Sequence, residues 1–165
     1  MGGVTRNKNI VTTLKALSVL EKGGYKVKYT IVGKVHDQSV YSKMMKDSRV
    51  CYIPQQTKYE LIKIYRENDI FVMPSYTETF GLVYAEAMSQ GLPIVYTEGQ
   101  GFDGHFDNGK VGYKVKASDY KQIANAIMDI AEEYDKMSEN CIMCVDKFCW
   151  DKICETYIQI YNSII

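Results

Sequence analysis

Residues 69–88 read DIFVMPSYTETFGLVYAEAM and decide the fold of this chain. The apolar run over residues 70–73 is typical of a strand buried inside a parallel sheet. A helix is predicted to open at Gly81, so the stretch predicts a strand, a loop and a helix in succession. Glu78 is then expected at the carboxyl edge of the strand, where open α/β sheets bind their ligands.

A helix start and two carboxylates would share this edge of the sheet. Gly81 lets a ligand approach the free amide groups of the first helical turn, which attract anions. Glu86 is predicted inside the helix, in an apolar stretch where a carboxylate usually needs hydrogen-bond donors. The segment therefore offers an acceptor, an amide nest and a second acceptor, which suits a sugar, a phosphate and another polyol.

The rest of the chain alternates strands with helices. Strands are predicted over residues 25–32, 50–53, 70–73, 92–96 and 112–115. Helices are predicted over residues 9–20, 38–47, 135–147 and 151–163. Two further helices are predicted, one that begins at a capping box formed by Thr57 and Glu60, and one that is capped by Ser118 or Asp119. This alternation predicts an α/β fold, a Rossmann-like parallel sheet with helices on both faces.

Length, charge and cysteine usage restrict the class of protein. The 165 residues suit one domain with a sizeable core. The 20 basic residues balance 20 acidic ones, so no electrostatic case for nucleic acid arises. No apolar run long enough for a transmembrane segment is found. The five cysteines are an odd number that clusters late, which favours a reducing compartment and predicts a cytoplasmic location.

The motifs around residues 74–93 resemble the carboxyl-terminal, donor-binding half of retaining GT-B glycosyltransferases of family 4 (group 1). Glu78 and Glu86 match the Glu-x7-Glu pattern of that family, with seven residues between them. Further pieces follow in the order of the family, namely Pro74-Ser75, Phe80-Gly81-Leu82, Glu86-Ala87-Met88 and Gly91-Leu92-Pro93. The resemblance extends over nearly the whole chain, from Lys8-Asn9 to the segment Phe148-Cys149-Trp150.

The resemblance implies roles for individual residues. Lys8 would meet the diphosphate and Glu78 the hydroxyl groups of the donor sugar, which makes these two the expected catalytic residues. Glu86 would accept from the ribose hydroxyls. The family commonly has an arginine five residues before the lysine, where Gly3 stands here, and Arg6 is the expected substitute. The remaining donor-binding residues that the resemblance implies are Gly33, Ile53, Ser75, Phe80, Gly81, Leu82 and Val83.

From position alone, Lys8 is slightly better explained as an exposed side chain near a helix start, and Gly33 is better explained as an ordinary turn. Thr97 and the turn at residues 99–101 are expected to close over the donor from the next strand. A zinc site at cysteines 141, 144, 149 and 154 is disfavoured, because their spacing gives no second close pair. His36 and His105 are isolated and are expected in loops.

The resemblance implies that residues 1–165 form a single nucleotide-sugar-binding domain, the carboxyl-terminal half of a two-domain enzyme whose amino-terminal acceptor domain is absent. Residues 1–4 read as the end of a first strand. The whole enzyme would move a sugar from a nucleotide diphosphate sugar to an acceptor hydroxyl with retention, in polysaccharide or glycoconjugate synthesis. Neither a metal nor a cofactor is implied, and peripheral membrane association of the whole enzyme stays open. The isolated domain is expected to be inactive.

Two alternatives compete with this hypothesis. One is a nucleotide-sugar epimerase that contains a related GT-B domain. The other is a nucleotide-binding module of doubly wound topology without catalysis. Titration with nucleoside diphosphates and sugar nucleotides would discriminate between these classes, because the sequence specifies neither the base nor the sugar.

Overall fold

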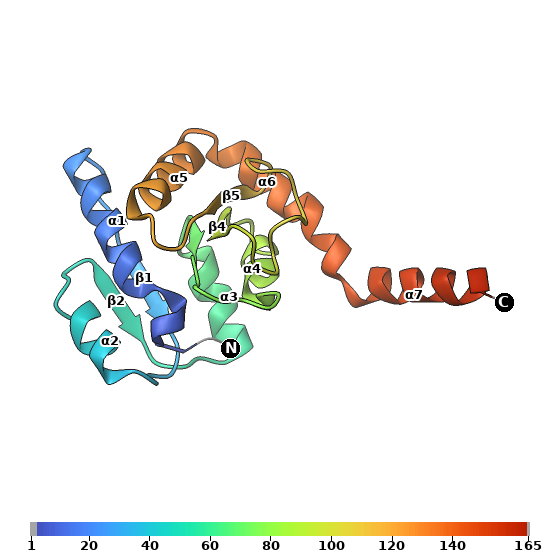
Figure 1. The fold of residues 1–165 in the computed structure, drawn as a ribbon, viewed down its shortest axis with the longest axis horizontal. Coiled ribbons are helices and arrows are strands. Elements are labelled where there is room, and N and C mark those ends of the chain that lie inside the picture. Colours follow the sequence, from blue (N-terminus) through green and yellow to red (C-terminus); the bar gives the residue numbers. More distant parts are fainter. Residues whose placement is uncertain (1–2, 165) are drawn as a thin grey trace.

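A computed structural model describes residues 3–164, which form five short strands among helices (Figure 1). All strand pairs are parallel. One sheet contains β1 (Tyr29–Val32) and β2 (Val50–Ile53), and the other contains β3 (Phe71–Val72), β4 (Ile94–Thr97) and β5 (Gly112–Val115), in that order. The helices are η1 (Arg6–Lys8), α1 (Ile10–Lys22), α2 (Gln38–Met44), α3 (Lys58–Arg66), α4 (Leu82–Met88), α5 (Tyr120–Glu132), α6 (Tyr134–Cys144), η2 (Val145–Phe148) and α7 (Trp150–Ile164).

Strand β4 separates two hydrophobic cores, because alternate side chains of a strand point to opposite faces. Val95 packs with Ile31 and Val115 in a core that also takes in side chains of α1, α2 and α5. Ile94 and Tyr96 pack in a second core with side chains of α4 and α6. The predicted α/β fold with parallel strands and helices on both faces is thus confirmed.

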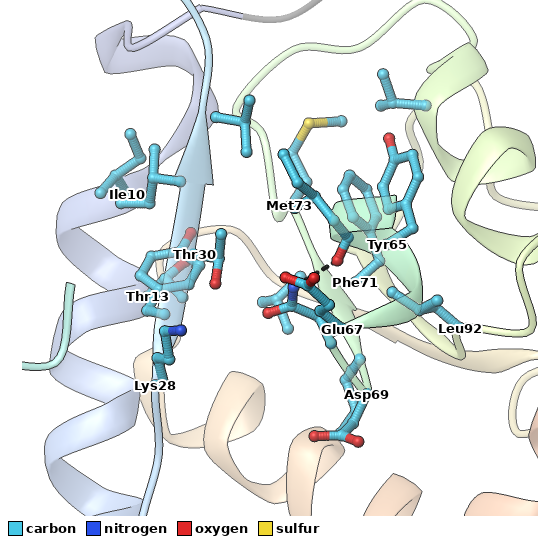
Figure 2. A pocket seen from close by; sticks show the side chains of 18 of the residues that line it. Ile10, Thr13, Lys28, Thr30, Tyr65, Glu67, Asp69, Phe71, Met73 and Leu92 are labelled. Carbon is cyan, nitrogen blue, oxygen red and sulfur yellow. Dashed lines mark hydrogen bonds between the residues drawn. The ribbon is translucent and has the colours of Figure 1, made fainter. Parts of the chain in front are cut away.

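The two sheets belong to one body even though they are not paired with each other. Ile31 of β1 and Val115 of β5 share the first core, and α1 packs against α5 across it. A cavity separates β1 from β3, and Figure 2 shows side chains of both strands around it. Among residues 3–164, no strand lies between these two edges.

Local signals placed several element boundaries correctly. The capping box is formed, with the Glu60 amide donating to Thr57 Oγ1 at 3.3 Å and the Thr57 amide donating to Glu60 Oε2 at 2.9 Å. Of the two candidate caps for α5, Asp119 is the one used, and its carboxylate accepts two backbone amides at 3.0 Å. Such caps are local, so the sequence predicts them well.

Several predicted boundaries differ from the structure; for example, the strand expected over residues 92–96 spans Ile94–Thr97, and the helix expected over residues 38–47 ends at Met44. The strand expected over residues 25–32 begins only at Tyr29, which lies opposite Val50, the first residue of its partner strand. The helix expected over residues 135–147 changes at Val145 into the 3-10 segment η2. Helix α7 then extends away from the body (Figure 1), and none of its described residues is buried. Within residues 3–164, no helix combines the length and apolar character that a membrane span requires.

Candidate functional site

Loops that follow the strands meet at the carboxyl edge of the sheets. The Tyr76 amide donates to the Asn7 carbonyl at 2.9 Å. The Asn7 side chain donates to the Thr77 carbonyl at 2.8 Å and accepts from the Thr77 amide at 3.0 Å. The η1 segment is therefore fastened to the loop after β3, and Lys8 is carried to the same place as Glu78.

Asn9 also stabilises the junction between η1 and the loop after β3. Its backbone is left-handed, with φ at 55°, a conformation in which asparagine is enriched among non-glycine residues. The buried side chain donates to the Pro74 carbonyl at 2.9 Å and to the Ala117 carbonyl at 2.6 Å. One amide group thus connects the segments that follow η1, β3 and β5. Sequence reasoning missed Asn9, although an asparagine at a helix start was a usable signal.

Lys8 and Glu78 form an ion pair at this junction, with 2.7 Å between Lys8 Nζ and Glu78 Oε2. Their side chains are 20% and 15% exposed, so the pair is largely sheltered from water. The backbone of Glu78 is held by the turn after β4, since its amide donates to Gln100 Oε1 at 2.9 Å and its carbonyl accepts from Gly101 at 3.0 Å. The two expected catalytic residues are therefore in direct contact.

The turn at residues 99–101 contacts Glu78, but Thr97 has a structural role. Its buried hydroxyl donates to the Ser75 carbonyl at 2.6 Å. Ser75 itself is fully buried, and no residue of the described chain forms a hydrogen bond with its hydroxyl. Ser75 accordingly lies behind the exposed surface of the site.

A cavity of about 500 Å³ opens beside the ion pair. This volume falls in the range of small-molecule sites. Its wall includes four of the predicted site residues, namely Lys8, Gly33, Val83 and Glu86. Residues from three different loops or helices thus face one space.

Glu86 lies on the outer side of α4 with an exposed side chain. Its apolar neighbours suggested a carboxylate in need of donors, but Tyr84, Ala87 and Met88 face the core instead. Within residues 3–164 no hydrogen bond to the Glu86 carboxylate is found. Burial, and secondly the charge of Glu86, raise the pKa of Tyr65, which places the two side chains near each other at the cavity.

The start of α4 follows the predicted geometry. Gly81 is left-handed with φ at 77°, and a Cβ there would lie 2.5 Å from the Tyr84 ring, so the position requires glycine. The amides of Leu82 and Val83 have no acceptor within the helix. Leu82 is 69% exposed. Phe80 is an anchor for this loop, because its ring packs against those of Phe102, His105 and Phe148.

Other predicted residues lie around this centre. Ile53 accepts the Gly33 amide at 3.1 Å where β1 and β2 end. Arg6 is exposed, and hydrogen bonds from Ser39 and Val40, with a smaller contribution from Arg6, lower the pKa of Asp37. A Cβ at Gly3 would lie 2.3 Å from the His36 ring, so an arginine at that position would require the ring to move.

The chain matches the family model of the glycosyl transferases group 1 over residues 1–143. It is 30% identical over 122 residues to the D-inositol 3-phosphate glycosyltransferase of Corynebacterium kroppenstedtii, which covers 72% of this chain and 27% of that relative. The chain therefore spans about a quarter of the length of this relative.

Solved structures share the fold. The Anabaena protein HepE, in a crystal structure with UDP and glucose, superposes with a TM-score of 0.80 at 17% identity, covering 96% of this chain and 47% of that one. The carboxyl-terminal domain of the glycosyl transferase LpcC from Francisella tularensis superposes with a TM-score of 0.76 at 21% identity, covering 89% and 82%. The fold is the α/β half of a GT-B glycosyltransferase, and the chain belongs to the glycosyl transferases group 1 family.

Proposed function

We propose that this domain binds the nucleotide diphosphate sugar donor of a retaining glycosyltransferase. The observation that carries the proposal is the Lys8–Glu78 ion pair, which stands beside a cavity that also takes in Gly33 and Glu86. A cation and two carboxylates at the carboxyl edge of parallel strands suit a ligand with phosphate and hydroxyl groups. HepE, which has this fold, binds UDP and glucose in its crystal structure.

Each charged residue takes one part of the donor. Lys8 would hold the diphosphate, whose negative charge competes with Glu78 for the ammonium group. Glu78, once released, would accept hydrogen bonds from the sugar hydroxyls. Glu86, on the outer side of α4, would accept from the ribose hydroxyls. A donor that carries both a diphosphate and a sugar therefore compensates both partners of the ion pair.

The chemistry that this half contributes is electrostatic. The leaving diphosphate gains negative charge as the bond to the sugar breaks, and Lys8 would stabilise that charge without a metal. We place the acceptor in an amino-terminal domain of a longer protein, so the isolated domain would bind donor without transferring sugar. Transfer with retention, a cytoplasmic location and a role in polysaccharide or glycoconjugate synthesis belong to the same proposal.

Calorimetry in the presence of a chelator tests the binding step. We would titrate the chain with UDP, GDP, ADP and dTDP, and then with the sugar nucleotides of the base that binds. At least one diphosphate should bind without metal. Lys8→Met should weaken it by about tenfold or more, because a charge-assisted hydrogen bond contributes roughly 1.5–3 kcal/mol. Lys22→Met is the matched control, and its effect should be small because Lys22 is exposed at the carboxyl end of α1, away from Lys8.

Two outcomes would contradict the proposal. Failure of all four diphosphates to bind would remove the nucleotide site. Binding that needs magnesium or manganese would remove the metal-free mechanism. Equal losses in Lys8→Met and Lys22→Met would instead show that the effect is one of net charge.

A further inference from the structure

The loop that carries Glu78 is held at two places. Asn7 exchanges two side-chain hydrogen bonds with the backbone of Thr77, one residue before the carboxylate. The segment after β4 bonds both backbone groups of Glu78 itself, through Gln100 Oε1 at 2.9 Å and the Gly101 amide at 3.0 Å. The orientation of Glu78 therefore depends on a segment that lies 22 positions away in sequence.

Gln100 makes its contact through the side chain. The Glu78 amide is a donor, so the oxygen end of the Gln100 amide group faces it. The backbone amide of Gln100 also donates to the Thr97 carbonyl at 3.4 Å, which closes the turn at the end of β4. Gln100 is thus both a part of this turn and the acceptor for the neighbouring loop.

The turn and the loop are in direct backbone contact at Gly101. A Cβ at this position would overlap the carbonyl group of Thr79 and would lie 2.9 Å from the Phe80 nitrogen. No gap separates the two segments there, so a displacement of the turn is transmitted to residues 78–80.

Asp103 holds the shape of the turn. Its Oδ2 accepts the Gly99 amide at 2.8 Å, and its own amide donates to the Gln100 carbonyl at 2.8 Å. Its Oδ1 lies 3.3 Å from Nζ of Lys114 on β5, and the Asp103 side chain is only 16% exposed. The hydrogen bond from Gly99 is the largest of the contributions that lower the pKa of Asp103. A line of contacts therefore runs from β5 through Asp103 and the turn to the loop before α4.

We propose that Gln100 and Asp103 are positioning residues for the sugar of the donor. Gln100 fixes the backbone of Glu78, and Asp103 fixes the turn that contains Gln100. Together they keep the Glu78 carboxylate where it accepts from the sugar hydroxyls. Hydrogen bonds weaken when their distances and angles depart from the preferred geometry, so a small shift of Glu78 lowers the affinity for the sugar. This inference rests on the proposed donor site and extends sugar recognition to the segment after β4.

Calorimetry with UDP-glucose and UDP, or with the same pair for whichever base the parent chain binds, tests the inference. Gln100→Ala and Asp103→Ala should each weaken the sugar nucleotide by about fivefold or more, because a hydrogen bond that holds Glu78 is lost. The free diphosphate should bind unchanged or more tightly. Gln122→Ala is the matched control, because Gln122 Oε1 accepts the Lys116 amide at 2.7 Å in the segment after β5. This control should change neither affinity by more than about twofold.

A background without the carboxylate separates positioning from a general loss of structure. In Glu78→Ala, the added substitutions Gln100→Ala and Asp103→Ala should weaken the sugar nucleotide by less than about twofold, since no carboxylate is left to misplace. Equal losses with and without Glu78 would overturn the proposal, as would an equal loss for the free diphosphate. Unchanged binding of the sugar nucleotide in both single variants would overturn it too. If Asp103→Ala does not fold, Asp103→Leu serves in its place.

Hydrogen exchange supplies a measurement without nucleotide. Residue-resolved NMR follows the Glu78 amide, whose acceptor Gln100 is still present in Asp103→Ala. Exchange of this amide should nevertheless become about fivefold faster or more, because the turn no longer holds Gln100 in place. Unchanged exchange would overturn the role of Asp103, whether or not a nucleotide binds. Faster exchange in a protein whose parent chain binds no diphosphate would support the line of contacts and contradict the proposed function alone.

Discussion

At the scale of single residues, the site is organised by contacts between distant parts of the chain. Lys8 and Glu78 are 70 positions apart and share one ion pair with both side chains largely sheltered. Removal of one partner from such a pair leaves the other charge poorly solvated. The free energy of ligand binding therefore depends on whether the ligand compensates Lys8 alone or Glu78 as well.

The two glutamates should respond differently to substitution. Glu78→Gln should weaken the binding of a sugar nucleotide while leaving the free nucleoside diphosphate unaffected or bound more tightly, because Lys8 is then unpaired. Glu86→Gln should weaken both ligands, by about tenfold or more for the loss of a charge-assisted bond. Parallel calorimetric titrations of the two variants decide the matter. Equal losses of diphosphate affinity would contradict the assignment of sugar to Glu78 and ribose to Glu86.

Asn9 should matter for stability because it connects three segments through one side chain. Asn9→Gly keeps the left-handed backbone and removes hydrogen bonds to Pro74 and Ala117, so the free energy of unfolding should fall by about 1–3 kcal/mol. Asn9→Ala should cost roughly 1–2 kcal/mol more, since alanine disfavours a φ of 55°. Urea denaturation measures both values. An alanine variant as stable as the glycine variant would show that the backbone conformation is not maintained.

At the scale of elements, an aromatic cluster ties the loop before α4 to the end of the domain. Phe80, Phe102, His105 and Phe148 pack with ring centroids 5.3 to 6.2 Å apart. Lys147 of η2 donates to the His105 carbonyl at 2.7 Å. The position of Phe80, and with it the start of α4, is thus coupled to the segment that follows α6.

This cluster should make stability dependent on pH. Burial, together with the charge of Lys147, lowers the pKa of His105 in the folded state. The unfolded chain therefore binds a proton more readily, and the free energy of unfolding falls as the pH drops below the unfolded value of about 6.5. Denaturation of the native chain and of His105→Phe between pH 7.5 and 5.5 compares the two slopes. A slope unchanged in the variant would contradict this assignment.

Elements were predictable where their determinants are local, and less so where they depend on neighbours. The capping box at Thr57 and the strand at residues 50–53 follow from adjacent residues and were located correctly. The strand expected over residues 25–32 is shorter than its alternating pattern predicts, because its bounds depend on pairing with β2. The Lys8–Glu78 pair, the Asn9 contacts and the cavity between the sheets were not foreseen, since each depends on segments far apart in sequence.

At the scale of the whole molecule, a sheltered body contrasts with a projecting helix. Met137 and Cys141 of α6 are fully buried in the two cores, whereas no described residue of α7 is buried. Figure 1 shows α7 leading away from the rest of the fold. The stability of the domain therefore resides in residues before the start of α7.

Deletion of residues 150–165 should leave the body intact. The free energy of unfolding should change by no more than about 0.5 kcal/mol, as for surface changes that remove no buried side chain. Met137→Ala is the contrasting variant and should cost about 2–5 kcal/mol, because the side chain is fully buried. Thermal and urea denaturation of both proteins measure the difference. A large loss on truncation would show that α7 packs against the body in solution.

The place of the one tryptophan in this chain has a practical consequence for spectroscopy. Trp150 opens α7 and is 76% exposed, while the rings around the cavity and in the aromatic cluster belong to tyrosine, phenylalanine and histidine. Selectively excited indole emission will therefore report on α7 and be nearly silent about a ligand beside Lys8. Titrations of nucleotides need calorimetry for that reason. A shift of the emission to shorter wavelength would instead register, without any label, that another surface has covered the projecting helix.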